Sequence, residues 1–172
     1  QLDAAGKDYE AALAIYERSL GPDNAKVAML LGNMAQVAYL KGRYEESASR
    51  LTRALAIRRA ALGEDHPDIV TAQANLSLVR LAQGKTTEAI ELLQGALAAQ
   101  ERVLGKDHPK ATFLLNNLGD AHMAAGRPAA AVESYRQALA ILERDKGANR
   151  ARVARTRASL GDALVRPARS TP

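Results

Sequence analysis

The residue types that carry most catalysis and metal binding are few in this sequence of 172 residues, and their spacing is unpromising. There is no cysteine, so a thiolate nucleophile, a disulfide framework and a cysteine-bound zinc or iron–sulfur site are excluded. His66 and His108 lie in similar segments, and neither has a second ligand three or four residues away, as zinc sites usually do. We expect Asp65 and Asp107 to cap the helices that follow, with the two histidines filling the turns. His122 is expected to be a packed side chain.

The segment Gly84-Lys85-Thr86-Thr87 is similar to the end of a phosphate-binding loop. That motif needs a glycine at position 79 and a strand before it, but position 79 is a valine. The equivalent segments Gly42-Arg43-Tyr44 and Gly126-Arg127-Pro128 indicate that all three are turns between paired helices. Neither a Gly-x-Ser-x-Gly elbow nor a Gly-rich dinucleotide turn is present. The sequence therefore predicts a protein that is not an enzyme and that has no cofactor or metal site.

Composition indicates an all-α chain that packs through alanine and leucine. Hydrophobic residues make up 47% of the chain and charged residues 25%, which excludes a disordered chain. Five tyrosines and one phenylalanine, with few β-branched runs, argue against a β-sandwich. No apolar stretch reaches the roughly 18–20 residues that a membrane span needs, and residues 1–5 do not resemble a signal peptide. We therefore expect no membrane span and a cytoplasmic location, with any targeting segment lying outside this sequence.

An internal repeat of 42 residues organises the chain. Three Leu-Gly pairs follow this period, at Leu20-Gly21, Leu62-Gly63 and Leu104-Gly105. Two further sets share the spacing, namely Gly42, Gly84 and Gly126, and Asn33, Asn75 and Asn117. Each period contains two amphipathic stretches, and in the middle period we expect a first helix over 67–83 and a second over 86–103. Neither could bury its apolar stripe alone, but stacked antiparallel pairs could.

These residues resemble the tetratricopeptide repeat, whose first helix reads aromatic-x2-Leu-Gly-x2-Tyr and whose second reads Ala-x3-Phe. Leu115-x2-Leu118-Gly119-x2-His122 is similar to the first pattern and Ala131-x3-Tyr135 to the second. The period of 42 and the linkers Leu62-Gly63-Glu64-Asp65-His66-Pro67 and Leu104-Gly105-Lys106-Asp107-His108-Pro109 resemble the kinesin-light-chain subclass. The resemblance implies a right-handed α-solenoid of antiparallel helix pairs, the tetratricopeptide superhelix. Gln73, Arg80 and Arg157 stand where the pattern has large apolar residues, so those units are expected to pack less well.

The repeats are expected to form a single array over residues 1–166. It comprises a partial second helix (9–20), three full pairs (25–62, 67–104 and 109–145) and a terminal helix of the first type (149–165). Residues 167–172 are expected to be disordered. Because the array begins with a helix that lacks its partner, we expect either a natural chain that continues upstream or another subunit that covers this end.

The resemblance also implies a peptide-binding groove. In this family the first helix of each pair lines the concave face, and its asparagine can hydrogen-bond the backbone of an extended peptide, since a carboxamide both donates and accepts. Helical spacing adds further residues on the same face, several of them apolar. The predicted groove consists of Met29, Asn33, Gln36, Tyr39, Asn75, Leu78, Leu81, Phe113, Asn116, Asn117, Asp120, Met123 and Arg155. Two alternatives remain open: asparagines that serve neighbouring helix groups, and apolar residues that pack adjacent helices of a tightly curved array.

Positive charge is concentrated near the C-terminus. The net charge is +5, and residues 144–172 alone carry eight basic side chains against two acidic ones. The last helix contains Arg150, Arg152, Arg155 and Arg157, and is interpreted either as a solvated cap of the array or as a patch for an acidic partner. Nucleic acid is disfavoured because no aromatic residues are interleaved for base stacking.

The sequence therefore predicts a non-enzymatic scaffold that holds a peptide segment or a partner helix of another protein in its groove. The alternative prediction is a self-associating assembly module of a larger multidomain protein, which forms homo-oligomers through the exposed ends of the array. A nucleic-acid-binding solenoid that uses the basic end is a third hypothesis.

Overall fold

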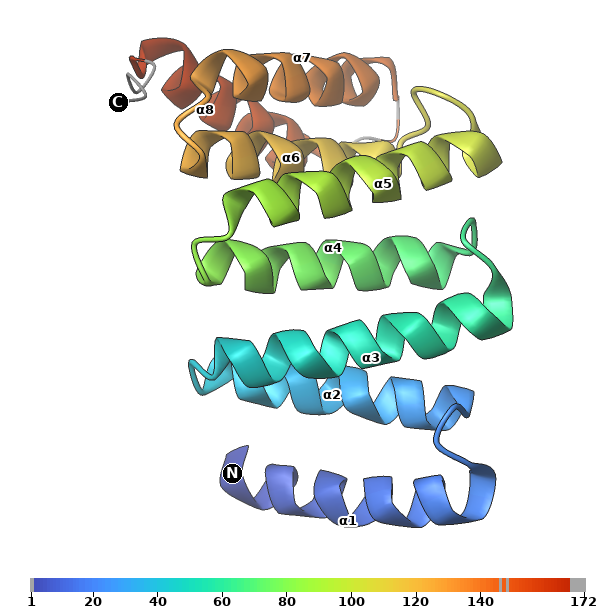
Figure 1. Cartoon of the computed structure of the whole chain (residues 1–172). Helices are drawn as coiled ribbons and strands as arrows, with labels where there is room; N and C mark the ends of the chain where they lie inside the picture. The colour runs from blue at the N-terminus through green and yellow to red at the C-terminus, as the bar shows by residue number, and fades with distance from the viewer. Residues whose placement is uncertain (1, 146, 148, 168–172) are drawn as a thin grey trace. The chain divides into compact units, whose positions relative to one another are not determined.

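The structure, a computed structural model, describes residues 2–145, 147 and 149–167. These residues contain eight α-helices and no strand (Figure 1): α1 (Leu2–Leu20), α2 (Ala25–Leu40), α3 (Tyr44–Leu62), α4 (Pro67–Ala82), α5 (Thr86–Leu104), α6 (Ala111–Ala124), α7 (Pro128–Arg144) and α8 (Arg150–Val165). The helices form two compact units, α1–α4 up to Gly84 and α5–α8 from Lys85. Within each unit successive helices run in opposite directions (Figure 1). The prediction of an all-α chain of antiparallel helix pairs is confirmed.

The glycines of the repeat end the helices at the predicted places. Gly63 and Gly105 follow α3 and α5 with φ angles of 80° and 83°. Gly42 and Gly84 have φ angles of 72° and 75° in the turns between paired helices. Residues with a Cβ atom rarely adopt this left-handed region, so a glycine in each turn lets the chain reverse without strain.

A histidine, rather than the predicted aspartate, caps α4. The side-chain Nδ1 of His66 accepts a hydrogen bond from the backbone N–H of Asp68 at 3.1 Å. His66 has extended backbone angles (φ −71°, ψ 139°), the region that a residue before proline prefers. At α2 the side chain of Asn24 accepts from the Lys26 N–H in the same way, at 2.9 Å. The prediction that Asp65 caps this helix was wrong, because a neutral imidazole nitrogen one residue later is itself a suitable acceptor.

The linker before α6 differs from the prediction in the same respect. His108 Nδ1 accepts from the backbone N–H of Lys110 at 3.2 Å. Asp107 has a φ angle of 62° and forms an ion pair with Arg144 at 3.0 Å, so it does not cap the helix. Helix α6 consequently begins at Ala111, because Pro109 and Lys110 still belong to the turn.

The first helix is longer than predicted. Helix α1 begins at Leu2, not at Tyr9, and its 19 residues equal the length of α3 and α5. Its first turns contain alanines and Gly6, so the apolar period that would predict a helix is weak there. The helix forms nonetheless, because alanine favours helix and the Asp3 carboxylate lies at the positive end of the helix dipole. At the other end α8 starts at Arg150 after an Asn149 cap. The predicted disordered tail lies, apart from Pro167, outside the described residues.

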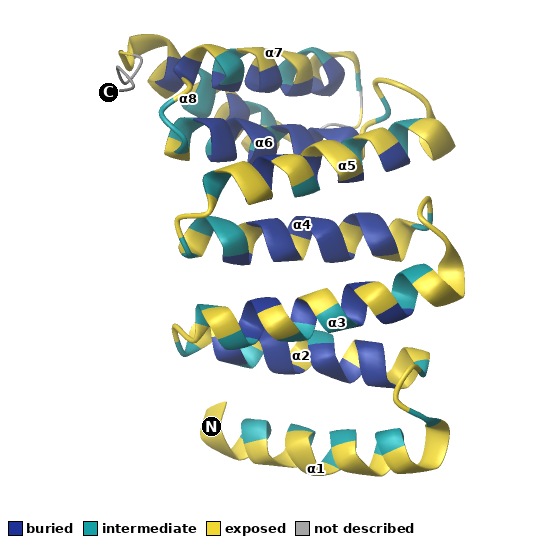
Figure 2. Cartoon of the chain, viewed as in Figure 1, coloured by how far each residue is buried: buried dark blue, intermediate teal, exposed yellow. Residues whose placement is uncertain are grey.

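The buried residues of each unit (Figure 2) are mostly apolar, and many of them are alanines. In the first unit the buried cluster comprises Val27, Ala28, Leu31, Ala54 and Ile57, with Leu13 and Tyr16 of α1 packed against it. In the second unit one cluster comprises Ala111, Leu115, Ala138 and Ile141, and another comprises Ala131, Tyr135 and Ala163. Alanines let the paired helices approach closely, and the larger residues fill the space between them.

The three polar departures from the repeat pattern are accommodated differently. Gln73 is buried, and its Oε1 has no hydrogen-bond partner among the described residues. Arg80 is half-buried and donates to Gln83 Oε1 at 2.9 Å. Arg157 is exposed and forms an ion pair with Glu143 at 2.8 Å. Only at Gln73, therefore, does the departure place an unpartnered polar atom inside the fold.

Candidate functional site

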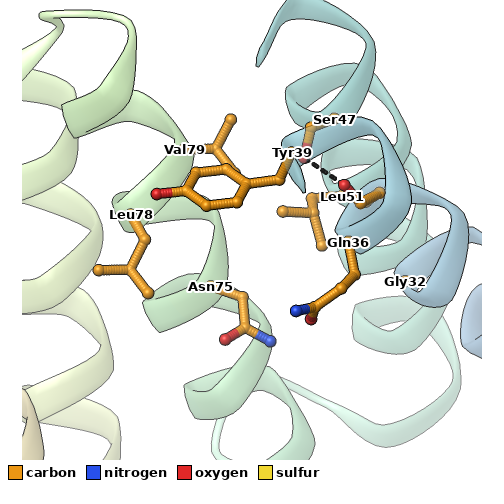
Figure 3. Close-up of a pocket in the computed structure, with 9 residues that line it drawn as sticks. Gly32, Gln36, Tyr39, Ser47, Leu51, Asn75, Leu78 and Val79 are labelled. Carbon is orange, nitrogen blue, oxygen red and sulfur yellow. Dashed lines mark hydrogen bonds between the residues drawn. The ribbon is translucent and has the colours of Figure 1, made fainter. Parts of the chain in front are cut away.

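Helices α2 and α4, the first helices of their pairs, pack on either side of α3 and leave an open cavity of about 140 Å³ between them. We call it the α2–α4 recess (Figure 3). Its lining residues are Gly32, Ala35, Gln36 and Tyr39 from α2, Ser47 and Leu51 from α3, and Asn75, Leu78 and Val79 from α4. Ser47 of α3 is buried and donates from Oγ to the Ala35 carbonyl at 2.8 Å, so its hydroxyl is already paired.

The walls of the recess expose large apolar side chains. Tyr39 is 38% exposed and Leu78 is 40% exposed. The ring of Tyr39 packs at a tilt against that of Tyr44, with centroids 5.4 Å apart, which fixes its position. Exposed apolar side chains that surround a concave surface are typical of a binding site for another apolar group.

Two carboxamides accompany this apolar surface. Gln36 of α2 and Asn75 of α4 are exposed and make no hydrogen bond to any other described residue. Figure 3 shows both carboxamides on the same side of the Tyr39 ring. Each has two N–H donors and a carbonyl acceptor, so together they can bind a peptide unit through both of its polar groups.

The second unit has a recess at the equivalent positions, between α6 and α8. This α6–α8 recess has a volume of about 440 Å³ and is lined by Asp120, Met123, Tyr135, Ser159, Asp162, Val165 and Arg166. Five of these residues lie two periods after residues of the α2–α4 recess: Gln36 becomes Asp120, Tyr39 becomes Met123, Leu51 becomes Tyr135, Asn75 becomes Ser159 and Leu78 becomes Asp162. The repeat thus produces the same recess twice with different side chains.

A hydrogen bond between two helices organises the α6–α8 recess. The Tyr135 hydroxyl donates to Asp120 Oδ1 at 2.6 Å. Burial of the ring, together with this bond, raises the pKa of Tyr135 well above its usual range, so the phenol keeps its proton. Arg155 of α8 lies 4.0 Å from the other oxygen of Asp120.

The remaining predicted groove residues differ in exposure and in hydrogen bonding. Met29, Asn33 and Phe113 are exposed, and Leu81 is half-buried. Asn116 already has partners, since its Nδ2 donates to the Thr112 carbonyl at 2.8 Å and its Oδ1 accepts from the Thr156 hydroxyl at 3.1 Å. Asn117 is buried, unlike Asn33 and Asn75, and its Nδ2 has no partner among the described residues. The asparagines of the repeat therefore do not form one uniform row.

Sequence reasoning missed the second helix of each pair as a contributor to the recesses. Leu51 and Tyr135 come from α3 and α7, and the repeat pattern predicts them only as packing residues. Both residues stand four positions after the small residue of the Ala-x3-Phe pattern. That spacing was the available signal, because it turns their side chains toward the neighbouring first helices.

In the described part of the chain, no group of three or more His, Asp or Glu side chains could hold a metal ion. No helix of that same part is both long and apolar enough to cross a membrane.

Comparison with known proteins agrees with this architecture. The sequence matches the model of the tetratricopeptide repeat over residues 1–60, 26–93, 68–144 and 112–170. The chain belongs to the tetratricopeptide repeat family. Tetratricopeptide repeats are generally protein-interaction scaffolds, and the predicted α-solenoid class is confirmed for this one.

Solved structures place it near the kinesin-light-chain type of repeat. Two crystal structures of a Podosopora anserina protein described as a kinesin light chain with nearly identical TPR-like repeats superpose with TM-scores of 0.84 and 0.83 at 26% identity. Each superposition covers 95% of this chain. The matched share of the other chain is 77% in the first structure and 78% in the second. BtubC (BKLC) from P. vanneervenii shares the fold with a TM-score of 0.69 at 23% identity, over 99% of this chain and 62% of that one. No curated protein matched the sequence.

Proposed function

We propose that this tetratricopeptide repeat protein is a non-enzymatic interaction module that binds an extended peptide segment of a protein partner at the α2–α4 recess. One observation carries the proposal. Two carboxamides, Gln36 and Asn75, which make no hydrogen bond to another described residue, flank an open cavity whose walls expose Tyr39 and Leu78. A peptide main chain has an alternating series of donors and acceptors, and the cavity accepts one of its apolar side chains.

The size of the recess sets the strength of binding. Burying one leucine-sized side chain contributes about 1.5–3 kcal/mol, and each carboxamide hydrogen bond adds about 0.5–1.5 kcal/mol. Association costs at least about 4 kcal/mol. One recess therefore gives weak binding, and the partner has to make further contacts along the first helices of the pairs.

A peptide-display selection tests this proposal. The wild-type protein is compared with a double variant, Gln36→Ala with Asn75→Ala, and with Gln94→Ala, which removes an exposed helical carboxamide far along the sequence on α5. Circular dichroism checks that helicity is unchanged. We expect a peptide motif that is enriched by the wild type and by Gln94→Ala but not by the double variant. Equal enrichment by all three proteins, or no enriched motif, contradicts the proposal.

Self-association is a second candidate function, which the surfaces of α1 and α8 favour. Helix α1 has no buried residue, exposes Ile15, and carries four carboxylates against two basic side chains. Helix α8 exposes Leu164 and Val165 and carries four arginines against one aspartate. Light scattering across a concentration series, in low and high salt, tests it with Ile15→Glu as the variant. A mass that rises with concentration and falls in the variant supports assembly through these helices, whereas a constant monomer mass rules it out.

A further inference from the structure

Gly32 is a residue of the α2–α4 recess whose type the backbone of the fold does not explain. It lies in the middle of α2, one helical turn before Gln36, and lines the recess (Figure 3). The glycines of the turns have positive φ angles, whereas Gly32 has the ordinary backbone of a helix. A glycine inside a helix is destabilising relative to alanine. The conformation of α2 therefore gives no reason for a glycine at this position.

Packing gives no reason for this glycine either. A Cβ atom added at Gly32 would meet, apart from its own helix, one described atom within 4 Å, namely Nη2 of Arg58 at 4.0 Å. That distance is an ordinary contact with the far end of a flexible side chain. The equivalent residues of α4 and α8 are Ala74 and Ala158, so other repeats carry a Cβ atom at this position. The space beside Gly32 is therefore free within the first unit.

The second unit shows what a side chain at this position can do. Two periods after Gly32 stands Asn116 of α6, whose Oδ1 accepts a hydrogen bond from the Thr156 hydroxyl of α8 at 3.1 Å. That bond joins the two first helices of the second unit. In the first unit the equivalent pair is Gly32 and Ala72, and neither has a polar side chain that could join α2 to α4. The missing side chain at position 32 thus keeps the recess open between these helices.

The open space has the size of an aromatic ring. Its volume is about 140 Å³, close to the apolar cavity of about 150 Å³ that binds benzene in another protein. Tyr39 exposes its ring at the recess, and aromatic rings attract one another in offset or edge-to-face arrangements. Leu51, Leu78 and Val79 supply further apolar lining. A phenyl group therefore fits both the volume and the walls.

We infer that Gly32 is a specificity-determining residue, whose missing side chain admits a phenylalanine side chain of the peptide partner to the α2–α4 recess. The inference rests on the proposed function, because it names the side chain that the recess takes. The phenyl ring lies against the α2 backbone at Gly32 and against the ring of Tyr39, while Gln36 and Asn75 bind the peptide main chain beside it. Glycine at position 32 lowers the stability of α2 and widens the recess.

The test uses capped pentapeptides as probes, with alanine at four positions and alanine, leucine or phenylalanine at the centre. Each is titrated into the ¹⁵N-labelled full chain, and affinity is measured from amide shifts by NMR. In the wild type we expect shifts in α2 and α4, with the phenylalanine peptide binding most tightly. In Gly32→Ala the affinity for the phenylalanine peptide should fall at least about fourfold, the factor that corresponds to one buried methylene group. The shifts caused by the alanine peptide should stay the same.

The same variant has a second readout of opposite sign. Gly32→Ala should raise the urea midpoint of unfolding, because alanine is the better helix former and its methyl group meets no obstacle. A glycine needed for packing would give a lower midpoint instead. The matched control is Gly161→Ala, the same exchange in α8, where a Cβ atom meets nothing within 4 Å. It should bind the phenylalanine peptide like the wild type, since Gly161 lies outside the α2–α4 recess.

The outcomes separate this inference from the proposed function. The role of Gly32 is overturned if Gly32→Ala binds the phenylalanine peptide like the wild type, or if it lowers the urea midpoint; wild-type shifts at Gln36 and Asn75 would then leave the proposed function standing. If Gln36→Ala with Asn75→Ala binds the phenylalanine peptide like the wild type while Gly32→Ala does not, the carboxamide role is refuted and the role of Gly32 stands. If no peptide shifts any amide of α2 or α4, both are refuted.

Discussion

The ring of Tyr135 on α7 lies directly against the backbone of Gly119 on α6. A Cβ atom added at position 119 would lie 2.6 Å from Tyr135 Cζ and closer still to Cε1. The absence of a side chain at Gly119 is therefore what allows Tyr135 to enter between the helices and reach Asp120 with its hydroxyl. In the first unit the equivalent pair is Ala35 and Leu51, where the smaller leucine leaves room for a methyl group.

Substitution at Gly119 is expected to destabilise the second unit. Gly119→Ala should lower the free energy of unfolding by about 1–3 kcal/mol, the usual cost of overpacking a core, despite the better helix propensity of alanine. Combining it with Tyr135→Leu recreates the Ala35–Leu51 pair and should recover most of the loss. Urea unfolding followed by circular dichroism measures both effects.

Gly161 provides the control for that substitution, because it is the equivalent residue of α8 and a Cβ there meets nothing within 4 Å. Gly161→Ala should be neutral or stabilising by up to about 1 kcal/mol. A loss of stability at Gly161 equal to that at Gly119 would show that packing against Tyr135 is not the cause.

Acid is expected to destabilise the protein through His122. Burial of the imidazole, and then the nearby charge of Arg127, lower the pKa of His122 below 6.5 in the folded state. As the pH falls below about 6.5 the unfolded chain takes up a proton that the folded chain does not, so stability is lost until the pH has passed through the folded pKa. Thermal unfolding at pH 7, 6 and 5 should show this loss.

The variant His122→Phe separates this residue from other titrating groups. It should have a flatter dependence of the melting temperature on pH between 7 and 5, whatever its absolute stability. An unchanged slope in His122→Phe would mean that other groups cause the acid sensitivity.

The cap of α4 is expected to depend on an acceptor atom and not on an imidazole. His66→Ala removes the bond to the Asp68 N–H and should cost about 0.5–2 kcal/mol. His66→Asn restores the acceptor that Asn24 supplies to α2 and should be close to wild type. Equal losses in both variants, measured by urea unfolding, would show that His66 acts through packing instead.

Helix α1 is expected to open before the rest of its unit, because none of its residues is buried and ion pairs hold much of it. Arg53 of α3 joins Glu17 at 2.7 Å and donates to the Pro22 carbonyl at 3.2 Å. Arg53→Met should raise hydrogen exchange in α1 by up to about fivefold, since an exposed ion pair contributes at most about 1 kcal/mol. Exchange in the core of α2 should stay the same, and Arg18→Met, on the exposed side of α1, should change neither.

Much of the fold was predictable because turn chemistry and helix periodicity are local and recur every 42 residues. Gly42 and Gly84 mark turns in the sequence and adopt positive φ angles in the structure. The same period relates Asn75 to Asn33, and helical spacing places Gln36 on the same face of α2 as Asn33. The structure brings Gln36 and Asn75 to one recess. Where the local signal was weak or had two solutions, as at the start of α1 and at the cap of α4, the prediction failed.

Local sequence signals were enough to predict the helix pairs, their boundaries to within a few residues and the repeat family. Packing between helices sets what equivalent residues do: Asn75 is exposed at a recess, Asn117 is buried, and Asn116 is bonded to Thr156 forty residues away. The reason is physical. Backbone conformation depends on near neighbours in the chain, whereas burial and hydrogen-bond partners depend on which helix packs alongside, and that helix carries different side chains in each repeat.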